Sequence, residues 1–282
     1  MDFLLTYPGF KKKAFTTSYD DGVIQDIRLI EILRKYGIKG TFNLNSGLSG
    51  VEKFREDIYK NQIDCSRLVL KDYVNLYSGF EVASHTSNHP FLETLSKKEQ
   101  KEEFEKDIAA LSDMFSQNVR GAAYPYGTYN ADTLEVEREL GIQYSRTTRS
   151  TYSFSRPYNF LLWHPTIHHT DPKLNETLER FFKDETTELG LFYLWGHAYE
   201  FAINHNFSVM EETCQKVKNH EEEIYLATNI ELVDYIKAAE LVYYKKREEG
   251  FLINPSDRDI YVIVKDTGEK VVLKPHERRK YE

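Results

Sequence analysis

Two short runs of this chain combine residue types and spacings that could do hydrolytic chemistry. Asp20 and Asp21 are adjacent carboxylates after the run 14–17, and His85 and His89 are two imidazoles with four-residue spacing. One carboxylate and two imidazoles supply three protein ligands to a metal ion and leave coordination positions open for water and substrate. The other carboxylate could then serve as a general base. Together the two runs predict a metal-dependent hydrolytic site.

Each run also has a structural interpretation. Asp-Asp-Gly is common turn chemistry, because Asp bonds its own backbone and Gly22 accepts positive φ. His85 and His89 could be a surface pair on a helix. Pro90 argues against that helix, since a proline disfavours the α conformation in the residue before it. Residues 80–84 are instead typical of a short strand. Both runs are therefore expected at the carboxyl ends of strands, where α/β barrels and open sheets place their chemistry.

The rest of the chain alternates strand and helix patterns that must position these ends. Strands are indicated at 41–45, 119–124, 142–147, 189–195 and 224–228, and helices at 23–36, 97–115, 130–141, 175–183, 210–218 and after the expected cap Asn229. Residues 48–80 are less regular and suggest one or two helices. Residues 150–173 suggest a long ordered insertion. Near the end of the chain, 259–264 and 270–273 predict a β-hairpin.

Four segments, in order, resemble the motifs of the polysaccharide deacetylases with the NodB-like fold, carbohydrate esterase family 4. These segments are Ser18–Gly22, His85–His89, Ala123–Gly127 and Leu191–His197. The resemblance covers most of the chain. It implies an α/β fold, a distorted (β/α) barrel of seven or eight strands over residues 1–250. Residues 251–282 would then be a small C-terminal β-hairpin extension packed on the barrel.

The resemblance also implies a metal site and a base. Asp21, His85 and His89 would hold one divalent metal ion. Zinc is the default for this ligand set, and imidazole and carboxylate also accept cobalt or nickel. Asp20 would take the proton of the attacking water as the general base.

Two further catalytic roles follow from the last and the third motif. His197 would protonate the leaving group as the general acid, a role that imidazole suits because its pKa lies near neutral pH. The backbone N–H of Tyr126 would help to bind the oxyanion. Pro125 and Trp195 belong to the same motifs, and we expect them to contact the substrate or to support the catalytic residues.

The sequence departs from the family pattern at two places. Ala123 occupies the position of an arginine that orients the base in many members, and the aspartate and tryptophan of the fourth motif are not visible in 144–147. We hypothesise that Arg146 replaces the missing arginine from the neighbouring strand. By the same argument, Glu200 could orient His197. His164, in the insertion, is a candidate for substrate contact.

The resemblance predicts a carbohydrate substrate that loses an acetyl group, N-acetyl before O-acetyl. Fold-level analogy does not choose between a polymer and a small molecule. Two alternatives remain: a catalytically inactive carbohydrate-binding protein on the same scaffold, and a metal-dependent amidohydrolase acting on a small amide that is not a sugar.

Composition excludes several other classes of function. The chain has 282 residues and a formal net charge of −8, which suits one large domain and argues against nucleic-acid binding. No apolar stretch is long enough for an ordinary transmembrane helix.

The chain carries two cysteines, too few for a disulfide framework. The first residues lack the features of a secretory signal, so we expect a cytoplasmic location unless a leader was removed. The oligomeric state is not predicted.

Overall fold

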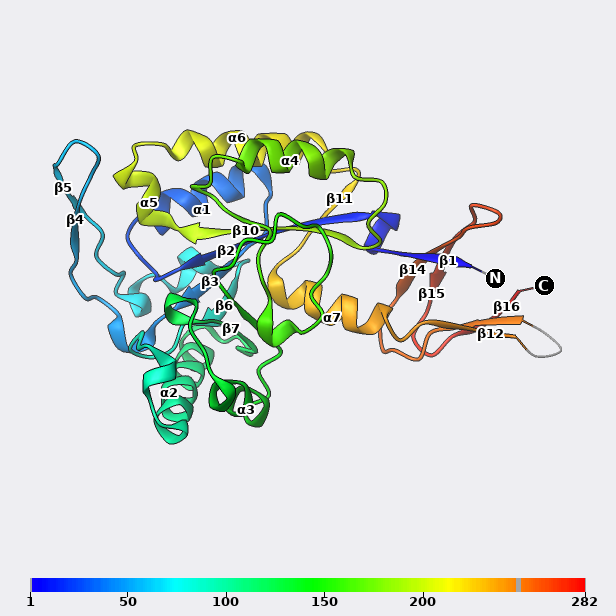
Figure 1. Ribbon diagram of the computed structural model, residues 1–282, viewed down its shortest axis with the longest axis horizontal. Helices are drawn as coiled ribbons and strands as arrows, with labels where there is room; N and C mark the ends of the chain where they lie inside the picture. The colour runs from blue at the N-terminus through cyan, green and yellow to red at the C-terminus, as the bar shows by residue number, and fades with distance from the viewer. Residues whose placement is uncertain (1, 247–249, 282) are drawn as a thin grey trace.

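A curled parallel sheet forms the centre of the computed structural model, which describes residues 2–246 and 250–281 (Figure 1). Its strands follow the order β8–β7–β6–β3–β2–β10–β9, and β11 also pairs with β2. The strands are β2 (Lys13–Asp20), β3 (Thr41–Leu44), β6 (Glu81–Ser84), β7 (Gly121–Ala123), β8 (Tyr144–Arg146), β9 (Ile167–His168), β10 (Gly190–His197) and β11 (Ile224–Leu226). The sheet confirms the predicted α/β barrel class, in the form of an open, curled half-barrel.

Helices cover the outside of this sheet, with α1, α4, α5 and α6 above it and α2 and α3 below it in Figure 1. The α-helices are α1 (Asp26–Tyr36), α2 (Lys97–Phe115), α3 (Ala131–Glu139), α4 (Leu174–Lys183), α5 (Ala198–Ile203), α6 (Phe207–Asn219) and α7 (Asn229–Ala239). Short 3-10 helices are η1 (Pro8–Phe10), η2 (Ser46–Leu48), η3 (Leu70–Asp72), η4 (Val74–Tyr77), η5 (Leu92–Thr94), η6 (Pro125–Gly127) and η7 (Phe160–Leu162). Within the described residues, no helix combines the length and apolar character needed to cross a membrane.

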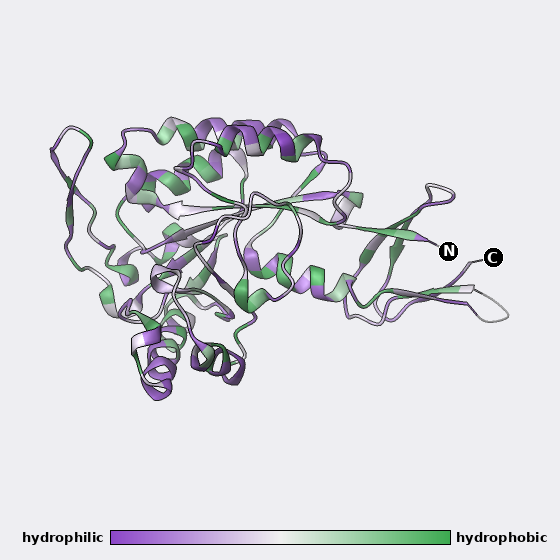
Figure 2. Cartoon of the chain, viewed as in Figure 1, coloured by the Kyte–Doolittle hydropathy of each residue, from purple (hydrophilic) through white to green (hydrophobic). Residues whose placement is uncertain are grey.

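Local capping signals explain where several helices begin and end. Gly37 takes φ 67° at the end of α1, a left-handed conformation that glycine adopts without strain. Ser96 forms the predicted capping box at the start of α2, a helix whose ribbon alternates hydrophilic and hydrophobic residues (Figure 2). The cap of α7 was predicted one residue too late. Thr228 caps this helix, while the buried Asn229 side chain contacts the Thr16 hydroxyl at 2.9 Å.

The register of β2 makes two predicted catalytic residues neighbours. β2 pairs with β10 along its whole length, and His197 at the end of β10 lies opposite Asp20 at the end of β2. On its other edge β2 pairs first with β11 and then with β3, where Asp20 lies opposite Asn43. Every residue of β2 is buried, as expected for a central strand of a parallel sheet.

Residues 150–173 link the two edges of the sheet. Trp163 forms a bridge with Arg146 of β8, and its backbone N–H donates to the Ser145 carbonyl at 2.9 Å. A few residues later, Ile167 and His168 form β9 beside β10. What the sequence suggested to be an insertion is therefore part of the sheet.

Two small antiparallel sheets lie where the described chain begins and ends (Figure 1). The predicted hairpin is present as β14 (Ile260–Val264) and β15 (Lys270–Leu273), and β1 (Phe3–Thr6) pairs with β14 as a third strand. The other sheet contains β12 (Tyr243–Lys246), β13 (Gly250–Ile253) and β16 (Arg278–Tyr281). The division of the chain at residue 250 stays a prediction.

The helices predicted within residues 48–80 are wrong. β4 (Phe54–Glu56) and β5 (Gln62–Asp64) form a two-stranded hairpin, and only the 3-10 helices η3 and η4 follow it. The Asp57 carboxylate accepts the backbone N–H groups of Tyr59 and Asn61 at 2.8 Å each. Such bonds stabilise a turn at the expense of a helix. The hairpin projects from the end of the molecule opposite the two small sheets (Figure 1).

Candidate active site

The carboxyl ends of β2, β6, β7 and β10 surround a cavity of about 230 Å³. Seven of the residues predicted from the sequence line it: Asp20, Asp21, His85, His89, Tyr126, Trp195 and His197. The remaining lining residues are Lys53, Arg55, Arg67, Tyr124, Thr148 and Tyr199. The fold thus brings the predicted metal ligands, base and acid together in one place.

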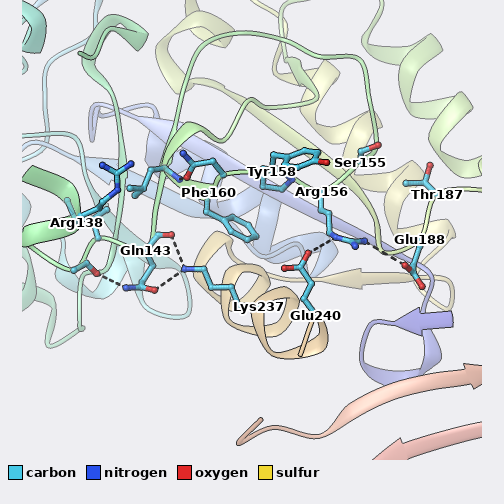
Figure 3. Close-up of a pocket in the computed structure, with 15 residues that line it drawn as sticks. Arg138, Gln143, Ser155, Arg156, Tyr158, Phe160, Thr187, Glu188, Lys237 and Glu240 are labelled. Atoms are coloured by element: carbon cyan, nitrogen blue, oxygen red, sulfur yellow. Dashed lines mark hydrogen bonds and ion pairs between the residues drawn. The ribbon is translucent and has the colours of Figure 1, made fainter. Parts of the chain in front are cut away.

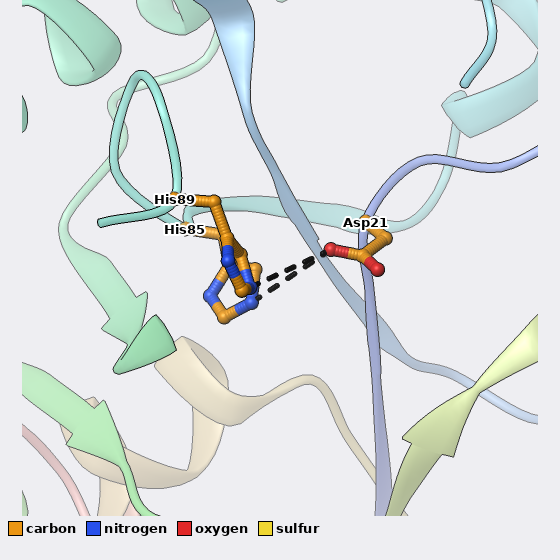
Figure 4. A group of neighbouring side chains, drawn as sticks. All are labelled: Asp21, His85 and His89. Carbon is orange, nitrogen blue, oxygen red and sulfur yellow. Dashed lines mark ion pairs between the residues drawn. The ribbon is translucent and has the colours of Figure 1, made fainter. Parts of the chain in front are cut away.

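Asp21, His85 and His89 form a group that could hold a metal ion, with both rings facing the carboxylate (Figure 4). Oδ1 of Asp21 lies 4.0 Å from Nε2 of His85 and 3.8 Å from Nε2 of His89. These separations are too long for hydrogen bonds. Two atoms bonded at about 2.1 Å to one tetrahedral ion lie about 3.4 Å apart. The observed separations exceed this value by about half an ångström, so a small inward movement of these side chains would let them share one ion.

Both histidines are held in the neutral form that binds metal. Nδ1 of His85 lies 2.8 Å from the carbonyl oxygen of Ala123, so the Nδ1–H donates there and the Nε2 lone pair faces Asp21. Burial lowers the pKa of His85. Burial, with the neighbouring His85, also lowers the pKa of His89 to about 4. This donor set fits zinc, cobalt or nickel.

Three site residues have backbone conformations in the left-handed region, with φ 84° at Asp21, 54° at His89 and 58° at Tyr126. Such residues cost about 1–3 kcal/mol each and persist only where their surroundings hold them in place. The turn at Asp21 continues through Gly22, where φ is 64° and a Cβ would lie 3.0 Å from the Leu44 side chain. The turn chemistry of Asp-Asp-Gly therefore aims the carboxylate at the cavity.

Asp20 is buried, and both of its oxygens have partners. Oδ1 accepts from Nδ2 of Asn43 at 2.8 Å, and Oδ2 accepts from Nη2 of Arg146. The buried Arg146 guanidinium lies 4.2 Å from the ring centre of Trp195. Burial raises the pKa of Asp20, but Arg146 and the nearby imidazoles outweigh it and hold the pKa below its ordinary value. Arg146 lies opposite Ala123 on the adjacent strand, and its replacement of the absent third-motif arginine stays a prediction.

Arg67 and Asn43 contact the carboxylates, and the sequence analysis predicted neither. Nη2 of Arg67 lies 3.0 Å from Oδ1 of Asp21, and Nη1 donates to the Asp21 backbone oxygen. Burial raises the pKa of Asp21, but Arg67 and the histidines hold it well below its usual range. Arg67 follows the irregular hairpin segment, where no local pattern marks it. Asn43 did have a signal, since it is a polar residue near the end of a buried strand.

His197 is held by a carboxylate on each side. Nε2 lies 3.7 Å from Oδ2 of Asp20, and Nδ1 lies 3.3 Å from Oε2 of Glu200. The His197 backbone N–H donates to the same Glu200 oxygen at 2.9 Å. Burial lowers the pKa of His197, but the Glu200 hydrogen bond and the Asp20 charge outweigh it and raise the pKa above its ordinary value. His197 therefore holds a proton more readily than a free imidazole.

Glu200 belongs to a second group of one carboxylate and two imidazoles, with His168 and His169. Its Oε2 lies 3.3 Å from Nε2 of each ring. Nδ1 of His168 accepts the Thr170 backbone N–H at 3.2 Å, so a neutral ring carries its proton on Nε2, facing Glu200. His169 is buried and stacks on Phe201 with 4.0 Å between ring centres. None of the three residues lines the cavity that contains Asp21.

Tyr126 forms the edge of the cavity. Its ring stacks on Phe91 with 3.8 Å between ring centres and meets His89 edge-on at 4.5 Å, while 52% of the residue stays exposed. Its backbone N–H donates to no acceptor among the described residues. A hydrogen-bond donor without a partner is therefore available beside the candidate metal ligands.

Four predicted residues do not line the cavity: Arg146 and Glu200, described above, and Pro125 and His164. Pro125 is buried at the start of η6. Nδ1 of His164 lies 2.6 Å from the Thr147 hydroxyl oxygen. The structure does not bring His164 to the cavity, and its role in substrate contact stays a prediction.

A larger cavity, of about 1090 Å³, lies elsewhere (Figure 3). Its walls contain residues that precede strands, such as Gln143 before β8 and Glu188 before β10. Two of its cations have partners: Nε of Arg156 donates to Glu240 at 2.7 Å, and Nζ of Lys237 lies 3.0 Å from the Gln143 side-chain oxygen. None of the predicted catalytic residues or metal ligands lines this cavity.

Known proteins of one family resemble this chain in sequence. Residues 8–145 match the family model described as polysaccharide deacetylase. YxkH of Bacillus subtilis (strain 168), whose polysaccharide deacetylase name is provisional, is 26% identical over 139 residues, which are 49% of this chain and 45% of YxkH. This chain thus matches less than half the length of that relative. With the four motifs and the half-barrel, these matches show that the chain belongs to the polysaccharide deacetylase family, carbohydrate esterase family 4.

Solved structures share the fold at low sequence identity. A Mycobacterium smegmatis protein with a provisional polysaccharide deacetylase name superposes with TM-score 0.59 at 14% identity, over 85% of this chain and 95% of that one. Peptidoglycan deacetylase PdaC from Bacillus subtilis gives TM-score 0.52 at 16% identity, over 83% and 96%. A carbohydrate esterase family 4 pseudoenzyme from Bacillus anthracis gives TM-score 0.50 at 17% identity, over 82% and 68%. At these identities the likeness concerns the fold.

Proposed function

We propose that this protein is a metal-dependent hydrolase that removes acetyl groups, N-acetyl before O-acetyl, from a carbohydrate. The observation that carries the proposal is the convergence of Asp20, Asp21, His85, His89 and His197 on one cavity. The site contains separate groups for binding an ion, taking a proton and giving a proton. Amide and ester hydrolysis needs all three functions.

A divalent ion held by Asp21, His85 and His89 would lower the pKa of its bound water and polarise the acetyl carbonyl, and zinc is the default for these ligands. Asp20 takes the proton of the attacking water. Its lowered pKa keeps it ionised at neutral pH. Arg146 and Asn43 each bind one of its oxygens, so the carboxylate keeps one orientation.

His197 supplies the proton for the leaving amine from the side of the cavity formed by β10. Its raised pKa favours the protonated ring that a general acid needs. Glu200 binds Nδ1 and the backbone N–H of His197, which leaves Nε2 directed to the cavity. Glu200 thus acts through His197 as a positioning residue.

The backbone N–H of Tyr126 provides a donor for the oxyanion. It has no acceptor among the described residues, and its unusual φ of 58° fixes its direction. Preorganised N–H groups of this kind stabilise negative charge that develops during acyl transfer.

The shape of the site favours a sugar over a small buried amide. The exposed rings of Tyr126 and Phe91 lie at the edge of the cavity, with 52% and 47% of the residues accessible, and aromatic faces are common contacts for sugar rings. No residue of the segment 150–173 lines the cavity. The segment expected to cover a small-molecule pocket is therefore absent from its walls.

Acetate release tests the proposal. The metal-reconstituted protein would be incubated with N-acetylated chito-oligosaccharides, acetylated xylan and a set of small non-sugar amides. We expect acetate from at least one acetylated sugar, and a loss of about 10²–10⁴-fold in Asp20→Asn and in His197→Ala. His276→Ala, at an exposed histidine outside the cavity, is the matched control for His197→Ala. Release from small amides alone would replace the sugar with a small amide as the substrate.

The catalytically inactive carbohydrate-binding alternative is favoured by the departures from the third and fourth motifs. It also has a precedent, since the fold occurs in a family 4 pseudoenzyme. The contact of Arg146 with Asp20 opposes it, because this contact restores a charge partner for the base. Sugar binding without acetate from any member of the panel would establish the inactive alternative.

A further inference from the structure

The cavity that contains the candidate catalytic residues also has three cationic side chains in its wall, Lys53, Arg55 and Arg67. Arg55 lies in β4 of the hairpin β4–β5, and Lys53 directly precedes this strand. The hairpin projects from the end of the molecule opposite the two small sheets (Figure 1). Both side chains line the cavity, whereas the exposed Phe54 between them does not.

Of these three cations, Arg67 already has hydrogen-bond and ion-pair partners. Arg67 binds the carboxylate and backbone oxygen of Asp21, and also Oδ1 of Asn45 at 2.7 Å. The other carboxylate, Asp20, is paired with Arg146. The two acids in the wall of the cavity are thus neutralised without Lys53 or Arg55.

Lys53 and Arg55 have no acidic partner. Across residues 2–246 and 250–281, no carboxylate oxygen lies within ion-pair distance of either side chain. Nε of Arg55 is buried and makes no hydrogen bond. The Arg55 guanidinium carbon lies 4.3 Å from the ring centre of Tyr199, which supports the group from one face and leaves its edges free.

The same hairpin shows what an ordinary surface cation does in this protein. Lys60 is exposed and pairs with Glu56 at 3.2 Å. The chain as a whole carries a net charge of −8, so acidic partners are abundant. Lys53 and Arg55 line one cavity without an ion-pair partner among the described residues, so they repel each other, and burial together with Arg55 lowers the pKa of Lys53. A bound anion would remove this repulsion.

We propose that Lys53 and Arg55 form an anion subsite, and that the substrate is an acetylated sugar carrying a carboxylate or phosphate group close to its acetyl group. This inference rests on the proposed deacetylase function and names the substrate class of the same site. Lys53 and Arg55 lie on the wall and not among the predicted metal ligands. They therefore select the substrate, while Asp20 and His197 perform the chemistry.

Binding to the full-length Asp20→Asn protein, reconstituted with zinc, tests the subsite. Calorimetry would compare neutral N,N′-diacetylchitobiose with a disaccharide containing N-acetylmuramic acid, which carries a carboxylate, and with N-acetylglucosamine 1-phosphate. We expect at least one anionic sugar to bind about tenfold or more tightly than the neutral one. Comparing the two anionic sugars shows whether the subsite recognises a carboxylate or a phosphate group. This preference should weaken between 50 and 300 mM salt, because exposed charges are screened over about 8 Å at 0.15 M.

Single-residue variants test whether Lys53 and Arg55 cause the preference for anionic sugars. Lys53→Gln and Arg55→Gln should each weaken binding of the preferred anionic sugar about tenfold to a hundredfold, as expected for a charge-assisted hydrogen bond. Neutral-sugar binding should change by less than about twofold. Arg55→Lys should retain much of the preference. Lys60→Gln, which removes the same charge from the same hairpin outside the cavity, should have no effect, and thermal unfolding would verify that every variant folds.

The outcomes separate this inference from the proposed function. Equal binding of neutral and anionic sugars overturns the subsite, and so does an equal loss for both in Arg55→Gln. In the latter case, the cations serve the acetyl group itself. Acetate release from neutral and anionic sugars alike, with unchanged rates in both variants, leaves the deacetylase intact and removes the subsite. Selective anionic binding without acetate from any sugar keeps the subsite and removes the deacetylase.

Discussion

Two groups in this protein each combine one carboxylate with two imidazoles, yet their geometry differs. In the group Asp21, His85 and His89, the imidazole nitrogens lie 3.8–4.0 Å from the carboxylate oxygen and line a cavity. In the group Glu200, His168 and His169, both nitrogens lie 3.3 Å from one oxygen, away from that cavity. Either group could hold an ion by its residue types and spacing, but only the first group lines the cavity with the predicted base and acid.

The difference lies in what neutralises each carboxylate. Asp21 is paired with Arg67, and burial lowers the pKa of His85 and His89, so both keep lone pairs for a metal. Glu200 is bonded to His197, whose pKa it raises. The same residue types therefore prepare an ion site in one place and a proton donor in the other. Residue types alone therefore do not identify a metal site. The residue that pairs with the carboxylate must be considered as well.

The largest expected effect is the loss of metal. His89→Gln removes one ligand from the first group, so we expect the bound metal to be lost and acetate release to fall at least about a thousandfold. Metal content by mass spectrometry and acetate release check this. His168→Gln is the matched control in the second group. If the two variants lost metal equally, the comparison between the groups would fail.

Arg146→Gln should have the next largest effect. Breaking a buried pair leaves the Asp20 carboxylate without its charge partner and costs about 3–5 kcal/mol of stability. Because Arg146 lowers the pKa of Asp20, its removal should raise that pKa and move the acid limb of kcat/KM to higher pH. Unfolding curves and a pH–rate profile measure both effects.

Metal content should be unchanged in Arg146→Gln, since Arg146 contacts no predicted ligand. Arg120→Gln, which breaks the more exposed pair with Asp234, is a control that should cost no more than about 1 kcal/mol. An acid limb that stayed in place would show that Arg146 does not set the charge state of the base.

Glu200→Gln should have a smaller effect that sharpens the distinction between the groups. Glu200 raises the pKa of His197, so its replacement by a neutral amide should lower that pKa. His197 would then lose its proton at lower pH, and the alkaline limb of the pH–rate profile should shift toward acid. We expect a loss of about 10–100-fold near neutral pH, with metal content retained. Loss of metal in this variant would mean that the second group holds the ion.

The smallest effect is expected for His168→Gln, which retains a donor toward Glu200. Acetate release should stay within about threefold of wild type, and the alkaline limb should move only slightly, because the contact of Glu200 with His197 is intact. A large loss of activity in this variant would indicate a direct role of His168 in the reaction.

Much of the site could be predicted because its residues follow hydrophobic strands. Asp20, Asp21 and His197 end the buried strands β2 and β10 or follow them directly, and parallel register brings such ends together. The function of Arg146 could be proposed because β8 was expected beside β7. In each case a local pattern marked the strand, and the parallel sheet supplied the long-range contact.

Other features depend on contacts that leave no local pattern. Arg67 and Arg55 come from a segment whose hydrophobic spacing suggested helices, while turn bonds around Asp57 fold it into a hairpin. The pairing of β1 with β14 joins residues near opposite ends of the chain. The contact of Trp163 with β8 also leaves no local pattern. It forms because the curvature of the sheet brings the two edges of the sheet close together.

The central claim is that one ion binds between Asp21, His85 and His89. X-ray diffraction from crystals grown with zinc, collected at the zinc absorption edge, tests it most directly. The account predicts one strong anomalous peak about 2.0–2.2 Å from Oδ1 of Asp21 and from Nε2 of both histidines. A peak between His168, His169 and Glu200 in its place, or no peak near Asp21, would contradict the account.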